Sequence, residues 1–570
     1  MNQLELLAID VLASLNNKCD IKPLIKRPII YSRILQLAEE NMSVDQREFY
    51  RQIGDRLRGD DKQSFDFRDN IYMISGLPGT GKSFLQSVIH LFCLTLTSKR
   101  ILCLAPTNLI AYQQKGKTIH SQIKDILSLF SISSGRDIEL KLAKSLVQEF
   151  HIVESFGELR KMSLSQLTEA ISQLARIRGS YTKLNVMAEE SSKMIILIDE
   201  GTMVSSLLFA VVFLRFPRAV FIIMYGPNQL PPISGVLKLP DCEYSILNDN
   251  CDHIYTLDTQ IRFDSGDNNN IFIEFVKYFS NALSGQLCNS SNETKLNKVK
   301  YFLKNLKIGG NLADYRKLYH GDRILIVNTN KQRSFENNQR LMAEGEGPIY
   351  NIDAIIPEEL PSNYNLESQM GIDKVLRIRK GVMCMLKANA LHMGLVKGMI
   401  VKVEDILLDD DEDMTVSEIV ITVIETKKKI SLSRFDLETN YLKDPKAETG
   451  FVYIRQFPIT LAYSLTAYSS QGKTLDCDIG IDLRTSSSSD HLINAFFVAL
   501  TRVRNPAQLF MNEHPVYWLE PSLNICNLDD FERIKRRILL SFPTPTPKSR
   551  LKSDINNIYS LNEIIEFVQK

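Results

Sequence analysis

Residues 71–83, with the sequence IYMISGLPGTGKS, decide the fold of this chain. The apolar run from Ile71 to Ile74 predicts a buried strand, and residues 76–83 match the pattern G-x-x-x-x-G-K-[ST] at every fixed position. Glycines in such a loop let successive backbone N–H groups turn toward phosphate oxygens, and the helix expected from Ser83 onward directs its positive end at them. The stretch therefore predicts a nucleotide site whose binding residues are Gly76, Gly79, Thr80, Gly81, Lys82 and Ser83.

A second pattern downstream supplies the rest of the expected nucleotide chemistry. The apolar strand predicted at residues 194–198 ends in Asp199 and Glu200. Two acids at a strand end are often only solvated, but downstream of a phosphate-binding loop we prefer the functional interpretation. Lys82 is expected to reach the β- and γ-phosphates of ATP, and Ser83 and Asp199 to ligate Mg²⁺. Glu200 is then the predicted base that orients and deprotonates the attacking water.

The composition is that of an ordinary globular protein with several domains. The chain has 570 residues, and its 68 Lys and Arg nearly balance its 67 Asp and Glu, so a surface for nucleic acid must be a local groove. Nine cysteines without a C-x-x-C pair indicate a reducing, intracellular compartment and no zinc or iron–sulfur site. The N-terminus lacks the pattern of a signal peptide. The most apolar stretch, residues 204–224, is broken by Arg215, Pro217 and Arg218, which argues against a membrane span.

Strand and helix patterns alternate through the first half of the chain. Apolar strands are predicted at residues 101–105, 194–198 and 220–224. This alternation favours an α/β fold with a parallel, doubly wound sheet and a site at the carboxyl ends of its strands. Helical spacing of apolar residues predicts a helical appendage over residues 1–40 and an inserted helical subdomain over residues 121–193.

The second half changes to short β patterns before its C-terminal segment. Between residues 336 and 449 the runs 399–403, 415–424 and 429–432 predict a small β-barrel. Residues 541–570 combine a proline-rich linker with a last amphipathic helix.

Gln46 has two equally good interpretations. With Ser43 it can form a capping box at the start of a helix, and its amide can instead bind the edge of an adenine as donor and acceptor. The sequence leaves both open.

Nine motifs in order give the chain a specific resemblance. They are GLPGTGKS (76–83), APTN (105–108), TIHS (118–121), IDEGTM (198–203), QLPPI (229–233), LDTQIRF (257–263), ILIVNTN (324–330), LAYSLTAYSSQGKTL (461–475) and FVALTRVR (497–504). In this order they resemble superfamily-1 helicases, and most closely the 5′→3′ branch of RecD-like, Dda-like and petite-integration-frequency-type enzymes. The resemblance spans about residues 42 to 510.

The resemblance implies two RecA-like P-loop lobes, each built on a parallel, doubly wound sheet. The first lobe would comprise residues 41–120 and 194–258, with the helical insertion 121–193. The second would comprise residues 259–335 and 450–540, with an SH3-like β insertion at 336–449. Arg262 and Arg502 would reach the γ-phosphate from the second lobe, Gln229 would sense that phosphate, and Gly472 would contact the nucleotide.

The implied activity is that of an ATP-dependent DNA helicase with ATP and Mg²⁺ as cofactors. It would translocate 5′→3′ on single-stranded DNA and act on duplex junctions as a monomer, with replication or single-strand-binding proteins as partners. The resemblance assigns DNA contacts to Pro106, Thr107, Asn108, Thr118, His120, Thr466 and Tyr468.

Three departures from the family keep a second function open. Tyr225-Gly226 replaces Gly-Asp, Tyr468-Ser469 replaces His-Lys, and Phe263 stands where Gln is common. The phosphate-binding residues are all present, so the alternative is a DNA-stimulated ATPase that regulates or loads a replication complex without unwinding. Another kind of P-loop NTPase, such as a kinase or ring ATPase, would not require the QLPP, QGKT and LTR motifs.

Overall fold

The computed structural model describes most of the chain between residues 28 and 511. The described ranges are 28–58, 67–97, 99–132, 137–233, 237–251, 253–263, 266–283, 292–317, 323–409, 415–442, 451–473, 475–483 and 492–511. They divide into two units. Unit 1 holds the described residues up to 263 together with 277–283, and unit 2 holds 266–276 and those from 292 onward.

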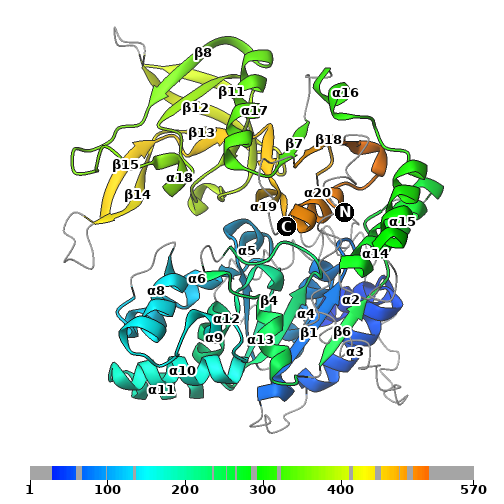
Figure 1. Ribbon diagram of the computed structural model, residues 1–570, viewed down its shortest axis with the longest axis vertical. Coiled ribbons are helices and arrows are strands. Elements are labelled where there is room, and N and C mark those ends of the chain that lie inside the picture. The colour runs from blue at the N-terminus through cyan, green and yellow to red at the C-terminus, as the bar shows by residue number, and fades with distance from the viewer. Residues whose placement is uncertain are drawn as a thin grey trace. The chain divides into compact units, whose positions relative to one another are not determined.

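Unit 1 is built on a six-stranded, wholly parallel sheet with the order β3-β2-β4-β5-β1-β6. Its strands β4, β1 and β6 are labelled in Figure 1. The strands are β1 (Ile71–Gly76), β2 (Arg100–Ala105), β3 (Lys117–Thr118), β4 (Met194–Ile198), β5 (Val220–Tyr225) and β6 (Ile254–Leu257). The strand that precedes the phosphate-binding loop therefore lies between β5 and β6, with Ile71 opposite Phe221. The apolar runs of the sequence form these strands.

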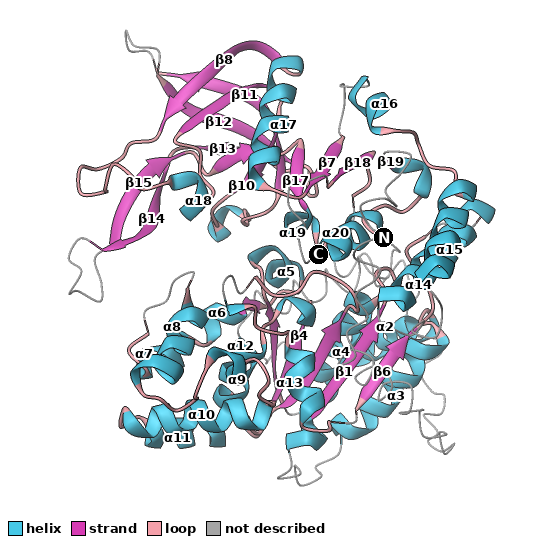
Figure 2. Ribbon diagram, viewed as in Figure 1, coloured by secondary structure: helices cyan, strands magenta, loops and turns pink. Residues whose placement is uncertain are grey.

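Successive strand residues point into two different cores. Ile71 and Met73 belong to one apolar cluster and Tyr72 and Ile74 to the other, as the period of two requires for a sheet covered on both faces. Figure 2 shows helices beside this sheet. The helices of unit 1 are α2 (Pro28–Glu40), α3 (Val44–Arg58), α4 (Lys82–Leu96), α5 (Asn108–Gln113), α6 (Ile119–Gln122), α7 (Lys124–Leu129), α8 (Ile138–Lys144), α9 (Phe156–Leu159), α10 (Leu164–Ile177), α11 (Tyr181–Ser191), α12 (Ser206–Arg215) and α13 (Cys242–Asn248).

Two predicted segments of unit 1 take definite forms. The described residues of 121–193 form helices α7–α11 and the turns between them, and their apolar side chains share a core with α12. Of the predicted appendage 1–40, residues 1–27 lie outside the described ranges. Within the predicted appendage, Ile34, Leu35 and Ala38 of α2 lie in the same core as the apolar face of α4.

Unit 2 contains a second parallel sheet, with the order β17-β7-β18-β19. Its strands are β7 (Ile324–Val327), β17 (Ser464–Thr466), β18 (Ile479–Asp482) and β19 (Leu509–Met511). The boundary between the units falls within α14 (Asp267–Leu283). The remaining helices are α15 (Asn292–Asn305), α16 (Leu312–Lys317), α17 (Asn330–Ala343), α18 (Leu366–Met370), α19 (Ala467–Ser470) and α20 (Leu492–Leu500).

The β insertion of unit 2 is antiparallel throughout the described pairings. A five-stranded sheet has the order β13-β12-β11-β10-β16, and two ribbons pair β14 with β15 and β8 with β9. The strands are β8 (Glu346–Asp353), β9 (Val375–Lys380), β10 (Met383–Leu386), β11 (Ile400–Leu408), β12 (Val416–Val423), β13 (Lys429–Leu432), β14 (Phe435–Leu442), β15 (Phe451–Gln456) and β16 (Ile459–Leu461). The antiparallel pairing reaches Leu461, beyond the predicted limit at 449, because β16 pairs with β10.

The predicted α/β class with two parallel sheets is confirmed. The end of the predicted second lobe and the segment 541–570 fall outside the described ranges. Among the described helices, none is long and apolar enough to cross a membrane.

Candidate nucleotide site and its surroundings

The phosphate-binding loop connects β1 to α4 in unit 1, and its shape requires glycine. Gly79 and Gly81 have φ angles of +93° and +76°, in the left-handed region. A Cβ at Gly81 would lie 2.5 Å from Nε2 of Gln46, so space as well as dihedral angle excludes a side chain there. The ammonium of Lys82 donates to the carbonyls of Gly76 at 2.6 Å and Leu77 at 3.0 Å. The predicted loop residues are therefore brought together at the carboxyl end of β1.

Asp199, at the carboxyl end of β4, lies beside Ser83. The Ser83 hydroxyl donates to Oδ2 of Asp199 at 3.4 Å, and the backbone N–H of Glu200 donates to Oδ1 at 2.9 Å. Burial and the charge of Glu200 raise the pKa of Asp199 to about 7. A buried carboxylate beside a hydroxyl is a hard-oxygen pair that suits Mg²⁺, whose charge would offset the cost of burial. The residues present therefore fit the predicted metal.

Glu200 has an unusual backbone. Its φ of +51° lies in the left-handed region, which costs a non-glycine residue about 1–3 kcal/mol. The predicted base therefore lies at a strained backbone position directly after the predicted metal ligand.

Gln46 contacts the loop with one end of its amide and the start of its own helix with the other. Nε2 donates to the carbonyls of Thr80 at 2.9 Å and Gly81 at 3.3 Å, and Oε1 accepts the backbone N–H of Ser43 at 3.1 Å. The Ser43 hydroxyl in turn accepts the backbone N–H of Gln46 at 3.4 Å. Of the two predicted roles, the capping box is the one that these contacts form, and the fully buried side chain also holds the phosphate-binding loop.

Arg262 lies in unit 1, next to this loop. The carbonyl of Gly79 accepts the backbone N–H groups of Ile261 at 2.9 Å and Arg262 at 3.1 Å. A Cβ at Gly79 would lie 2.9 Å from Cβ of Arg262. The resemblance placed the start of the second lobe at residue 259, whereas the structure places residues 259–263 in unit 1 and bonds Ile261 and Arg262 to its loop.

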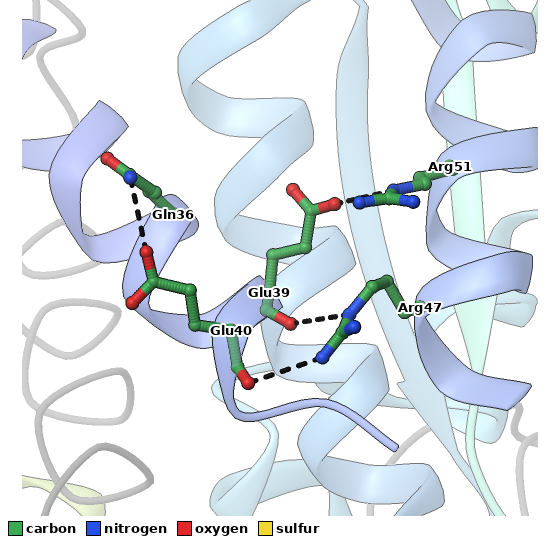
Figure 3. Close-up of a pocket in the computed structure, with 5 residues that line it drawn as sticks. All are labelled: Gln36, Glu39, Glu40, Arg47 and Arg51. Carbon is green, nitrogen blue, oxygen red and sulfur yellow. Dashed lines mark hydrogen bonds and ion pairs between the residues drawn. The ribbon is translucent and has the colours of Figure 1, made fainter. Parts of the chain in front are cut away.

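A pocket of about 370 Å³ lies between α2 and α3 and contains none of the predicted site residues (Figure 3). It is lined by Gln36, Glu39, Glu40, Arg47 and Arg51. Arg47 donates to the backbone carbonyls of Glu39 and Glu40 at the end of α2 and of Met42 in the turn that follows. Arg51 forms an ion pair with Glu39 at 2.7 Å. These contacts fasten the turn that leads into Ser43 and Gln46.

The side chain of Gln229 occupies the space next to Gly226. A Cβ at Gly226 would lie 2.5 Å from Nε2 of Gln229, whose side chain is buried. A side chain at position 226, such as the acid that the resembling helicases carry, would require the Gln229 amide to move. The hydroxyl of the preceding Tyr225 donates a hydrogen bond to Oδ2 of Asp241.

The predicted DNA contacts of unit 1 lie at one edge of its sheet. Residues 106–108 follow β2, and β3 pairs with β2 so that Thr118 lies opposite Ala105. Thr107 and Thr118 cap the helices α5 and α6 through their hydroxyls. Burial lowers the pKa of His120, which favours its neutral form. The structure therefore gathers residues 106–108 with Thr118 and His120.

The remaining predicted residues belong to unit 2. Thr466 caps α19, where Tyr468 is half-buried, and Gly472 follows with φ of +75°. Arg502 is 2% exposed, and its Nε, Nη1 and Nη2 donate to Val498 O, Lys473 O and Thr501 Oγ1 at 2.9, 3.1 and 3.1 Å. The predicted arginine finger is thus held inside unit 2.

Two residues that the sequence did not single out take part in this site. Asp45 accepts backbone N–H groups of the segment that carries Arg262, and the side chain of Gln114 donates to Asp199. Asp45 is adjacent to the capping-box residue Gln46, and Gln114 lies between two motifs. No periodic pattern marks either one.

No family model matches the sequence. The ATP-dependent DNA helicase Pif1 of Campylobacter jejuni is 24% identical over 472 residues, which cover 77% of this chain and 88% of that relative. Among solved structures, Pif1 helicase from Candida albicans has a TM-score of 0.57 at 17% identity over 88% of this chain and 99% of its own. Pif1 of Bacteroides bound to single-stranded DNA has a TM-score of 0.55 at 19% identity over 87% of this chain and 97% of its own.

Proposed function

We propose that this chain is an ATP-dependent DNA helicase that moves 5′→3′ along single-stranded DNA and unwinds duplex junctions, like the Pif1 helicases it resembles. The main support for the proposal is the hydrogen bond between Ser83 and Asp199 next to the phosphate-binding loop that contains Lys82. This nucleotide site occurs in a chain whose similarity to a Pif1 helicase covers 77% of its length.

The side chains of unit 1 have separate tasks in this function. Lys82 neutralises the β- and γ-phosphates, and Ser83 and Asp199 hold Mg²⁺. When bound, Mg²⁺ supplies positive charge next to the phosphates during transfer. Glu200 orients the attacking water and takes its proton. Gln46 holds the phosphate-binding loop through Thr80, and the carbonyl of Gly79 binds the segment that carries Arg262 to that loop.

A DNA-stimulated ATPase that regulates or loads a replication complex without unwinding is the second candidate. The observations that favour it are Gly226, whose site holds the Gln229 amide, and Ser469, which stands where resembling helicases carry a lysine. Both functions require ATP hydrolysis that depends on DNA, so only strand displacement separates them.

ATP hydrolysis measured against increasing single-stranded DNA tests the shared part of the proposal. Turnover should rise and saturate with DNA in the presence of Mg²⁺, and Lys82→Ala should remove it, because the charge that neutralises the γ-phosphate is lost. If the ATP turnover of the wild-type chain does not change with DNA concentration, both candidate functions are rejected. A monomeric state, an intracellular location and protein partners in replication stay predictions from the sequence.

A further inference from the structure

Gln114 connects the predicted DNA-contact segment to the predicted metal ligand. Its Nε2 donates to Oδ2 of Asp199 at 2.9 Å, the same oxygen that the Ser83 hydroxyl approaches at 3.4 Å. Gln114 is the residue directly after α5, and α5 begins immediately after Thr107. One side chain therefore spans from the end of this helix to the carboxylate at the end of β4.

The backbone at Gln114 is held in a defined turn. The N–H of Gln114 donates to the carbonyl of Ile110 at 3.0 Å. Beyond it, Lys115 adopts a left-handed φ of +53° and donates to Tyr112, and Gly116 donates to Ala111 at 2.7 Å. These two bonds form a Schellman motif, which fixes the direction in which the chain leaves a helix.

Glycine at position 116 lets this turn lie directly on the sheet. A Cβ on Gly116 would be 2.3 Å from the carbonyl oxygen of Cys103 in β2. The turn therefore ties the position of Gln114 to that of α5, and it packs closely against β2 at Gly116.

Helix α5 has a small core of its own. Its buried residues Ile110 and Ala111 form a cluster with Ala105 that is separate from the two large clusters on either face of the sheet. A short helix on a small cluster shifts at lower energetic cost than an element embedded in a large core. The bond from Gln114 to Asp199 is then a polar link through which a shift of α5 reaches the nucleotide site.

Predicted DNA contacts flank Gln114 on both sides in sequence. Thr107 and Asn108 stand at the start of α5, and Thr118 and His120 follow the turn that ends it. β2 and β3 hold these two groups at neighbouring positions, with Ala105 opposite Thr118. A strand of DNA that contacts either group therefore acts on the segment to which Gln114 belongs.

We propose that Gln114 is a positioning residue that couples DNA binding at α5 to Mg²⁺–nucleotide binding at Asp199. This inference rests on the proposed function, because it requires DNA to bind at residues 106–108 and 118–120. A hydrogen bond to a metal-ligating carboxylate orients that ligand, and its removal typically costs about 10–100-fold in metal affinity or activity. Coupling of this kind is reciprocal, so nucleotide should change DNA affinity by the factor by which DNA changes nucleotide affinity.

The test compares Gln114→Met with Gln113→Met in the full chain. Gln113 is an exposed glutamine next in sequence, so the pair controls for the substitution itself. For each protein, the Kd of fluorescent oligo-dT is measured without nucleotide and with a non-hydrolysable ATP analogue plus Mg²⁺. The Kd of the analogue is measured with and without oligo-dT, and again in EDTA.

We expect the wild type and Gln113→Met to show the same coupling factor, in the usual range of about 5–150-fold. In Gln114→Met the factor should fall to within about threefold of one, while the Kd of the analogue in EDTA stays as in the wild type, because Gln114 acts through the metal ligand.

An unchanged coupling factor in Gln114→Met, an equal loss in Gln113→Met, or no coupling in a wild type that binds both ligands would overturn the inference. None of these three results contradicts ATP hydrolysis or unwinding by this chain. A wild type that binds no single-stranded DNA at all would instead reject the proposed function.

Discussion

Oδ2 of Asp45 accepts the backbone N–H of Asp258 at 2.7 Å, joining the first turn of α3 to the residue that follows β6. The same oxygen accepts the N–H of Thr259 at 3.1 Å. Two residues further on, the carbonyl of Gly79 accepts the N–H groups of Ile261 and Arg262. The segment that carries Arg262 is therefore anchored at both ends to unit 1, so its backbone position relative to the phosphate-binding loop is set within that unit.

Asp45→Asn should lower the stability of unit 1 at neutral pH. Burial alone would raise the pKa of Asp45, but hydrogen bonds from the Ser43 hydroxyl and from the N–H groups of Thr259, Asp258 and Gln46 lower it below its usual value. A lowered folded pKa means that the ionised carboxylate stabilises the fold above its unfolded pKa of about 3.9, and that this stabilisation is lost as the pH falls through the folded value.

Thermal melts of the wild type and Asp45→Asn between pH 7 and pH 3 measure this contribution. We expect a loss of about 1 kcal/mol at pH 7, the usual net value of a hydrogen bond in a partly exposed, solvent-screened position. The difference in Tm should shrink toward zero on acidification. Equal Tm values at pH 7, or a difference that does not change with pH, would contradict the role of the carboxylate.

Glu200→Gln should separate nucleotide binding from hydrolysis. The amide keeps the size of the side chain but cannot accept the proton of the attacking water, so turnover should fall by at least the ~10²-fold typical of a lost general base. The Kd of ATP, measured on the same preparation, should stay within about threefold. Loss of binding together with turnover would show that Glu200 holds the site together and is not its base.

Arg262→Ala and Arg502→Ala should differ in stability. The Nε, Nη1 and Nη2 atoms of Arg502 all donate inside unit 2. The Val498 carbonyl also accepts from Thr501, so the carbonyl of Lys473 is the group that loses its donor when Arg502 is removed. An unsatisfied buried group costs about 1–3 kcal/mol, so Arg502→Ala should unfold at a clearly lower temperature than the wild type. Arg262→Ala should reduce turnover with a much smaller change in Tm. A wild-type Tm for Arg502→Ala would contradict its buried position.

The fold was predictable because burial leaves a periodic signal. The apolar runs at 71–74 and 194–198 form β1 and β4, and the helical spacing over 121–193 corresponds to α7–α11. The attachment of Arg262 to the loop was not predictable, since backbone bonds from residues 261 and 262 to Gly79 depend on no side-chain pattern. The bond from Asp45 to Asp258 joins residues 213 positions apart. Polar contacts of this kind follow from the completed sheet, which brings β6 beside β1.

Ser469→Lys tests whether α19 faces the phosphate backbone of DNA. The hydroxyl of Ser469 lies 2.9 Å from the hydroxyl of Thr466. The Thr466 hydroxyl also caps α19 by accepting the backbone N–H of Ser469. A lysine there should tighten single-strand binding and steepen the slope of log affinity against log salt by about 0.7. Tyr468→Ala serves as the companion variant and should weaken binding without a change in slope if the ring stacks on a base. An unchanged slope in Ser469→Lys would show that this face does not meet phosphates.

Strand displacement with tailed duplexes tests the central claim most directly. The wild-type chain is mixed with ATP and Mg²⁺ and with two duplexes that are identical except for a single-stranded tail at the 5′ or the 3′ end, and Glu200→Gln serves as the inactive control. We predict displacement of the 5′-tailed duplex only, dependent on ATP hydrolysis. ATP hydrolysis stimulated by DNA without displacement of either duplex would favour the non-unwinding ATPase, and displacement of the 3′-tailed duplex alone would contradict the proposed direction of movement.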